Sequence, residues 1–145
     1  MRFQSTALRG YRNLGSVRRT DWGPGLNLIL GPNGAGKTNL LESLNVLSGW
    51  GTFSGRMSSA VAWDSPDGRA LLAARTSGER DIEVSVLLSS RMTLKADGER
   101  ISGSDLRARL PSLSFLPTDI DLIDGPSSVR RRFLDRLCAL CIPSY

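Results

Sequence analysis

Residues 31–38, GPNGAGKT, have the types and the spacing of a loop that binds phosphate. They satisfy the pattern G-x-x-x-x-G-K-[ST], whose glycines let the backbone curl so that successive N–H groups point at a β-phosphate. Lys37 would bring a mobile cation to the β- and γ-phosphates, and the Thr38 hydroxyl would take one coordination position of Mg²⁺. The pattern therefore predicts a site for a nucleoside triphosphate with Mg²⁺. Its candidate residues are Gly31, Pro32, Asn33, Gly34, Ala35, Gly36, Lys37 and Thr38, and Thr38 is also the candidate metal ligand.

Such a loop must lie between a strand and a helix, and the flanking residues predict both. The run GLNLIL at 25–30 favours a buried strand. From Asn39, leucines recur at i, i+1, i+4 and i+7, which indicates an amphipathic helix that fades in the glycine-rich segment 48–55. The amino end of this helix would add partial positive charge beside the loop. The leucines in question are Leu40, Leu41, Leu44 and Leu47.

The rest of the chain predicts one α/β domain in three consecutive parts. Residues 1–55 contain short strands, the loop and its helix. Residues 56–103 contain apolar runs separated by turn sequences, which predict an antiparallel β-meander. Residues 104–145 predict a helical end segment. AVAWDS, residues 60–65, is interpreted as the first arm of the meander.

Composition limits the partners and the compartment. The lysines are Lys37 and Lys95, so 17 of the 19 basic residues are arginine, and the net charge is +5. Arginine binds phosphate and carboxylate bidentately, which favours an anionic partner. The amino end has no apolar core of signal-peptide length, and no stretch approaches the roughly 18 apolar residues of a membrane span, so we expect a cytoplasmic protein. Cys138 and Cys141, in a chain without histidine, predict reduced thiols rather than a zinc site.

Residues that would position water for hydrolysis are not apparent. A Walker B element is a strand of about four apolar residues ending in Asp, usually followed by a catalytic Glu. Residues 60–65 are the only formal match, but they lack the Glu and run into the turn SPDG. LSGW at 47–50 and ISGSD at 101–105 resemble fragments of the LSGGQ signature of ABC ATPases, yet neither leads through a helix to a Walker B strand. We therefore expect nucleotide binding, with no catalytic residue in this chain.

Three motifs, in order, resemble the RecF family of bacterial DNA replication and repair ATPases, whose heads are ABC/SMC-like. They are LRGYRN at 8–13, the segment at 24–56 that contains the phosphate loop followed by KTNLLES, and FLPTDIDLIDGPSSVRRRFLD at 115–135. The resemblance covers nearly the whole chain. It implies a P-loop NTPase fold, the amino-terminal lobe of an ABC-type ATPase head, with an antiparallel β-meander subdomain and a carboxy-terminal helix. It also implies ATP and Mg²⁺ as cofactors.

The same resemblance implies partners and further site residues. The family forms an ATP-dependent homodimer, binds single-stranded, gapped or junction DNA, and acts with RecR and RecO in recombinational repair and the SOS response. Arg12 and Asn13 match a family segment that lies beside the nucleotide, and the alternative for them is a turn Asn beside a surface Arg. The family's signature motif, Walker B strand and helical second domain all lie beyond Tyr145. The resemblance thus implies a truncated chain without autonomous hydrolysis.

Other interpretations stay open. An ABC transporter-type ATPase subunit or a small phosphotransferase would also carry the loop. A transporter subunit is expected to show a Q-loop glutamine, but the only glutamine is Gln4, and a phosphotransferase needs a lid and acceptor site that residues 60–101 do not suggest. A truncated and inactive product is a third interpretation.

Three consecutive arginines, residues 130–132, lie in the predicted last helix. At about 100° per residue, Arg131 and Arg132 fall outside the apolar stripe and predict an exposed ion-pair cluster with Asp135. Arg130 falls within the stripe, where a buried guanidinium needs a carboxylate, a carbonyl or a phosphate as its partner. The candidate partners are Asp119, Asp121 and Asp124.

Overall fold

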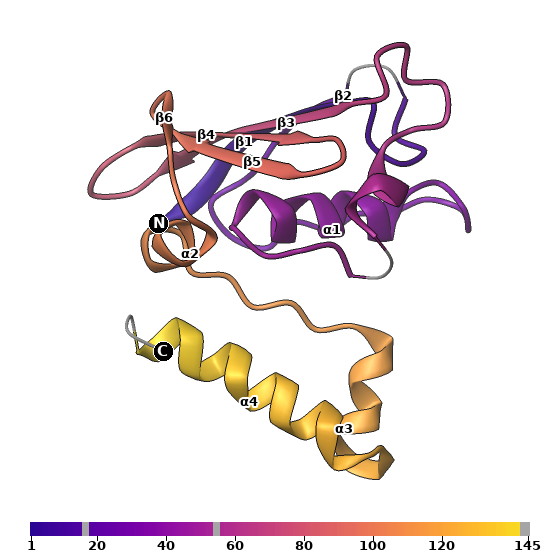
Figure 1. Ribbon diagram of the computed structural model, residues 1–145, viewed down its shortest axis with the longest axis vertical. Helices are drawn as coiled ribbons and strands as arrows, with labels where there is room; N and C mark the ends of the chain where they lie inside the picture. The colour runs from indigo at the N-terminus through magenta and orange to yellow at the C-terminus, as the bar shows by residue number, and fades with distance from the viewer. Residues whose placement is uncertain (16–17, 54–55, 143–145) are drawn as a thin grey trace.

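The computed structural model describes residues 1–15, 18–53 and 56–142, and its elements lie in layers (Figure 1). A β-sheet lies at the top of the view, and α1 (Lys37–Leu47) and α2 (Gly103–Arg109) lie beneath it. Below them, a long extended segment leads to α3 (Asp121–Asp124) and α4 (Ser127–Cys141). The predicted α/β fold class, with its antiparallel sheet and carboxy-terminal helix, is confirmed.

The sheet has six strands in the order β2-β1-β3-β4-β5-β6, and every pairing is antiparallel. The predicted meander corresponds to β3 through β6. The sheet extends beyond the meander because β1 pairs with β3, which brings the amino-terminal strands alongside it. The strands are β1 (Arg2–Arg9), β2 (Arg18–Asp21), β3 (Ala70–Ser77), β4 (Ile82–Leu88), β5 (Met92–Ala96) and β6 (Glu99–Arg100).

The core lies between the sheet and α1. Strand alternation sends every second side chain of β3 and β4 to this face, where Leu72 and Val86 are opposite each other and fully buried. α1 contributes Val46 and Leu47, which are also fully buried. Leu41, predicted on the apolar side of the helix, is 46% exposed, because α1 turns the side that carries Val46 and Leu47 toward the sheet.

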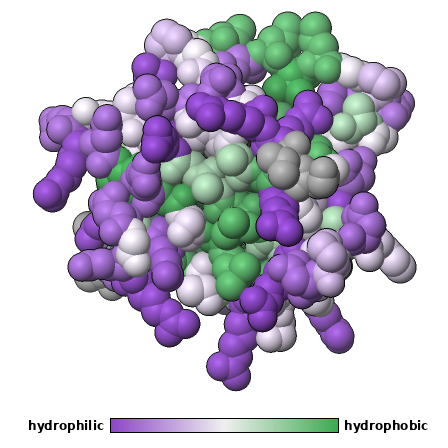
Figure 2. All heavy atoms as spheres, turned by 90° about the horizontal axis from the view of Figure 1, so that it is seen from above, coloured by the Kyte–Doolittle hydropathy of each residue, from purple (hydrophilic) through white to green (hydrophobic). Residues whose placement is uncertain are grey.

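The other face of the sheet is open. Its central side chains are small, as at Ala7 and Ala73, and charged residues surround them. Seen from above, this face shows an apolar area ringed by hydrophilic side chains (Figure 2). One exposed cross-strand ion pair, between Arg75 Nε and Glu83 Oε1 at 2.8 Å, lies here and contributes about 0–1 kcal/mol.

Two short 3-10 turns, η1 (Met57–Ala60) and η2 (Pro117–Ile120), complete the helical elements. α2 begins with an N-cap, because the Ser102 hydroxyl accepts a hydrogen bond from the backbone N–H of Asp105 at 3.1 Å. Within the described ranges, no helix combines the length and the apolar character needed to cross a bilayer.

Trp50 links α4 to the rest of the fold. Its ring centroid lies 4.6 Å from the guanidinium carbon of Arg107 and 4.9 Å from that of Arg136, so cations from α2 and α4 both lie over one indole. Phe115 and Phe133 form a second contact, with ring centroids 6.0 Å apart. No described residue of α4 is fully buried. The helix therefore docks through a small set of aromatic and cationic contacts.

Arg130 is exposed, and its partner is a backbone carbonyl. Its Nη1 donates to the Gly125 oxygen at 2.8 Å, just after the end of α3. The expectation that Arg130 is buried is therefore wrong, because α4 packs too loosely to bury the base of its apolar stripe. Of the three kinds of partner expected for its guanidinium, the structure shows a carbonyl. Among the described residues, no ion pair joins Arg130 to the candidate aspartates, which are Asp119, Asp121 and Asp124.

Arg131, Arg132 and Asp135 line one open depression on the surface of α4. They are exposed, as their position outside the apolar stripe predicted. Their pairing with one another stays a prediction.

Residues 25–30 form no strand, so the prediction of a buried strand before the loop is wrong for this structure. Leu26, Leu28 and Leu30 are 97%, 74% and 79% exposed, while Ile29 packs against the core. A strand needs a neighbour that accepts its backbone hydrogen bonds, and none of the described strands pairs with this segment. Alternating apolar residues indicate a strand but do not supply its neighbour.

Residues 60–65 are not the first arm of the meander, which is a second correction. Ala60 ends η1, and Val61 makes an isolated bridge with Tyr11. Turns follow at once, closed by hydrogen bonds from Ser65 N to the Ala62 carbonyl and from Gly68 N to the Ser65 carbonyl. The chain therefore reverses before a ladder can form, and the meander begins with β3.

Candidate nucleotide-binding site

The predicted phosphate loop ends directly at the first turn of α1. Gly36 is the N-cap residue, with φ +89° in the left-handed region, and Gly34 has φ +80°. A Cβ on Gly36 would stand 2.5 Å from Leu14 Cδ2 and 2.8 Å from Asn13 Oδ1. Glycine is required there for two reasons, the backbone conformation and the lack of space. No side chain caps α1, so its first N–H groups keep their capacity to bind an anion.

Lys37 folds back over the loop. Its ammonium group donates to the carbonyl oxygens of Gly31 and Pro32, each at 2.8 Å. The lysine is thus held above the loop, where phosphate oxygens could replace carbonyl oxygens as acceptors. Thr38, the next residue of α1, is exposed and lines the same shallow depression, which has a volume of about 300 Å³. The other lining residues are Asn13, Asn33, Gly34, Gly36 and Asn39.

Asn13 braces the loop from the side. Its Nδ2 donates to the Gly34 carbonyl at 2.7 Å, and its Oδ1 accepts from Asn39 Nδ2 at 2.8 Å. One amide therefore joins the turn after β1, the phosphate loop and the first turn of α1. The sequence resemblance predicts that Asn13 lies beside the nucleotide, and the structure shows it in direct contact with the backbone of the loop.

Arg12 is placed differently. Its backbone has φ +50°, and its guanidinium forms a bidentate pair with Glu42, from Nε to Oε2 and from Nη2 to Oε1, both at 2.9 Å. A further hydrogen bond runs from Nη1 to the Ser59 carbonyl at 3.0 Å. Arg12 thus precedes Asn13, the residue that contacts the loop, while its own charged group is bound to the middle of α1 and to η1.

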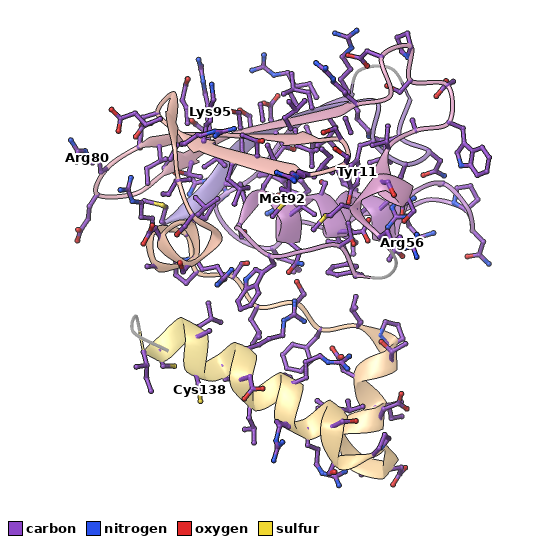
Figure 3. The ribbon with its side chains drawn as sticks, viewed as in Figure 1. Tyr11, Arg56, Arg80, Met92, Lys95 and Cys138 are labelled. Atoms are coloured by element: carbon purple, nitrogen blue, oxygen red, sulfur yellow. The ribbon has the colours of Figure 1, made fainter. Side chains whose placement is uncertain are left out.

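Glu42 is the site residue that the sequence did not reveal. Glu42 is 2% exposed, and its carboxylate also accepts from the Tyr11 hydroxyl at 2.6 Å and from Phe53 N at 2.8 Å. Tyr11 lies between the sheet and α1 (Figure 3). No pattern in the sequence pairs Glu42 with Tyr11 and Arg12, which lie 31 and 30 positions before it. Its one local signal is an acidic residue in a helix segment that otherwise faces the core.

The network keeps Glu42 ionised. Burial alone would raise the pKa of its carboxyl group, but hydrogen bonds from Arg12, Tyr11 and Phe53 N outweigh burial and lower that pKa below 4.5. Burial and the hydrogen bond to Glu42 raise the pKa of the Tyr11 hydroxyl, which stays protonated. Because the pKa of Glu42 is lower in the folded protein than its ordinary value, its ionised form stabilises the fold at pH values above the ordinary pKa. This stabilisation is lost as the pH falls through the lowered pKa.

Comparison with known proteins first defines a class. A protein-family model described as an AAA domain matches residues 7–112, which include the phosphate loop and α1. The chain therefore belongs to the AAA domain family.

Within this class, the chain is similar to the DNA replication and repair protein RecF. It is 33% identical to RecF of Heliobacterium modesticaldum over 148 positions, which cover all of this chain and 40% of that protein. It is 38% identical to RecF of Leifsonia xyli, over 94% of this chain and 36% of that protein. The resemblance predicted from the motifs is confirmed, and the chain spans about two-fifths of the length of these curated relatives.

Solved structures share the fold. The structure of the recombination mediator RecF–ATP in the RecFOR pathway superposes with a TM-score of 0.84 at 24% identity, over 96% of this chain and 38% of that one. A structure from a study of ATP-driven dimerization and DNA-stimulated activation of SMC ATPases superposes with a TM-score of 0.74 at 16% identity, over 94% of this chain and 99% of that one. The predicted ABC/SMC-like head fold is confirmed.

Proposed function

We propose that this chain is the ATP-binding module of a RecF-type DNA replication and repair protein. The observation that carries the proposal is the loop itself, with two left-handed glycines, an uncapped helix start and Lys37 held over its carbonyls. ATP phosphates would accept from the loop N–H groups and from the Lys37 ammonium group. The similarity to RecF supports ATP as the nucleotide and favours this function over a transporter subunit or a phosphotransferase.

Mg²⁺ is the metal that the site suits. Thr38 offers a hydroxyl oxygen beside Lys37, at the exposed rim of the depression. Mg²⁺ prefers oxygen ligands and keeps several waters, so one protein hydroxyl with phosphate oxygens matches its chemistry. When bound, the ion would neutralise charge on the β- and γ-phosphates. We assign no catalytic residue within this chain.

DNA binding and dimerisation are further parts of the proposal. The net charge of +5, carried mostly by arginine, supports an anionic partner such as single-stranded or gapped DNA. An ATP-dependent homodimer, the proteins RecR and RecO as partners, and action in the cytoplasm follow from the likeness to RecF.

The two lysines of the chain provide a matched test of nucleotide binding. Lys37→Ala removes the cation that faces the phosphates and should weaken ATP binding at least about tenfold, measured by titration calorimetry with Mg²⁺ present. Lys95→Ala is the control, because Lys95 is exposed on β5 and points away from α1 (Figure 3). Equal affinities of Lys37→Ala and the unmodified chain would contradict the proposal.

A further inference from the structure

A buried carboxylate lies five residues along α1 from the lysine of the loop. Glu42 is 2% exposed and receives four hydrogen bonds, two at each oxygen. Oε2 accepts from the Tyr11 hydroxyl and Arg12 Nε, and Oε1 accepts from Arg12 Nη2 and Phe53 N. A buried charge is stable only when it is paired and its lone pairs are occupied, and Glu42 meets both conditions.

The donors come from two segments, one that precedes α1 in the chain and one that follows it. Tyr11 and Arg12 belong to the turn that follows β1, and Phe53 belongs to the segment that follows α1. Glu42 therefore fixes the turn after β1 against the middle of the helix. Because α1 also carries the end of the phosphate loop, this attachment sets the turn and the loop relative to each other.

The attachment reaches the loop through the backbone of Arg12. Its left-handed conformation, φ +50°, is unfavourable for a residue with a Cβ and persists only where surrounding contacts impose it. The bidentate pair with Glu42 and the bond to the Ser59 carbonyl supply such contacts. The next residue is Asn13, whose amide donates to the Gly34 carbonyl and accepts from Asn39.

We propose that Glu42 is a positioning residue for nucleotide binding, which acts by holding Arg12 and thereby pressing the Asn13 amide against the phosphate loop. The inference rests on the proposed ATP-binding function and names how that site is preorganised. Arg12 then acts on the nucleotide through Asn13, because the two guanidinium nitrogens that pair with Glu42 and the one bound to Ser59 are already committed. A loop held in its binding conformation loses less conformational entropy when ATP arrives.

A double-mutant cycle on ATP affinity tests the inference. Glu42→Gln keeps the size of the side chain but removes the charge and turns one acceptor into a donor that faces N–H groups. Asn13→Ala removes the hydrogen bonds that join the Asn13 amide to the Gly34 carbonyl and to Asn39. Each single variant should weaken ATP binding about five- to twentyfold. The double variant should be little weaker than the worse single one, because both changes release the same contact. Glu83→Gln, in an exposed pair on the sheet, is the control and should bind ATP like the unmodified chain.

A purely structural role for Glu42 would give a different pattern. Affinity should be measured where urea unfolding shows each variant to be folded. If Glu42→Gln then lowers stability while ATP affinity is unchanged, or if its effect and that of Asn13→Ala are additive, the inference is wrong. If Glu42→Gln does not fold, Tyr11→Phe replaces it in the cycle, because it removes one donor and leaves the ion pair. Tyr11→Phe should show a smaller loss with the same non-additivity, and additive effects would again contradict the inference.

The two proposals fail in different ways. Loss of ATP binding in Lys37→Ala, with unchanged binding in Glu42→Gln and Asn13→Ala, would overturn the positioning role and leave the proposed function intact. Unchanged binding in Lys37→Ala would overturn the proposed function itself.

Discussion

Gly36 illustrates how a single residue sets the geometry of the loop. It is buried, has φ +89°, and faces Leu14 and Asn13 at distances that leave no room for a methyl group. Gly98, in the turn between β5 and β6, has nearly the same φ, +84°, but nothing within 4 Å of an added Cβ. Comparison of Gly36 with Gly98 therefore separates the effect of backbone conformation on stability from the effect of steric crowding.

Gly36→Ala should be more destabilising than Gly98→Ala. Both substitutions place a Cβ in the left-handed region, at a cost of about 1–2 kcal/mol. At Gly36 the methyl group would also displace Leu14 and the Asn13 amide, which adds about 1–3 kcal/mol and should weaken ATP binding. Urea unfolding and ATP titration of the two variants measure both effects, and equal stability losses would show that the loop accommodates the methyl group.

Residue chemistry that is local in sequence could be predicted, and chemistry that depends on distant contacts could not. The loop residues 31–38 carry the phosphate-binding pattern in their own sequence, so the motif was sufficient to place the candidate loop before α1. Glu42 gains its proposed role from contacts with Tyr11 and Arg12, about thirty positions earlier in the chain, and helix periodicity marks it only as a polar residue. The sequence left a carboxylate, a carbonyl or a phosphate as the partner of Arg130, and the structure identifies the nearby Gly125 carbonyl.

At the level of elements, the segment before the loop shows what periodicity cannot determine. β3 and β4 were predicted within the meander and form, because each lies next to a strand that follows or precedes it closely in the chain. Residues 25–30 have an equally apolar pattern but pair with none of the described strands, and all three of their leucines face solvent. Propensity therefore predicted strands where local pairing was available, and it failed where a strand depended on a partner distant in sequence.

Substitutions of two leucines would compare the stability contributed by residues 25–30 with that contributed by the paired strands. Leu28 is 74% exposed, so Leu28→Ser should change the free energy of unfolding by no more than about 0.5 kcal/mol. Leu72 is fully buried opposite Val86, so Leu72→Ala should cost about 2–5 kcal/mol. Urea unfolding of both variants provides the comparison, and a loss above about 1 kcal/mol in Leu28→Ser would show that the segment packs in solution.

For the whole molecule, charge is the property most relevant to its proposed partner. The chain carries 19 basic and 14 acidic residues, and the basic ones are spread over the sheet, the turns and α4. Among the described residues, the exposed ion pairs Arg19–Asp21 and Arg75–Glu83 use two of the arginines on the sheet. Most of the positive charge therefore remains at the surface, where it can neutralise phosphate groups.

DNA binding should show the salt dependence of phosphate contacts. With ATP and Mg²⁺ present, the logarithm of the association constant for gapped DNA should fall linearly with the logarithm of the salt concentration. The slope reports the number of phosphates neutralised. Fluorescence anisotropy with labelled gapped DNA between 50 and 200 mM salt, roughly the range over which such contacts lose most affinity, measures the slope. A flat response, or no binding with ATP present, would contradict the DNA-binding part of the proposed function.

The contacts of the Trp50 ring with two guanidinium groups give the molecule an intrinsic optical signal. Of its three tryptophans, Trp63 is fully exposed, and Trp22 donates its indole N–H to Thr6 Oγ1 on β1 at 3.1 Å. Trp50 alone among them touches a cation carried by α4, since Arg136 lies over its ring. With phenylalanine at positions 22 and 63, the emission of the remaining indole would follow the docking of α4, so the helix carries a fluorescent reporter of its own position.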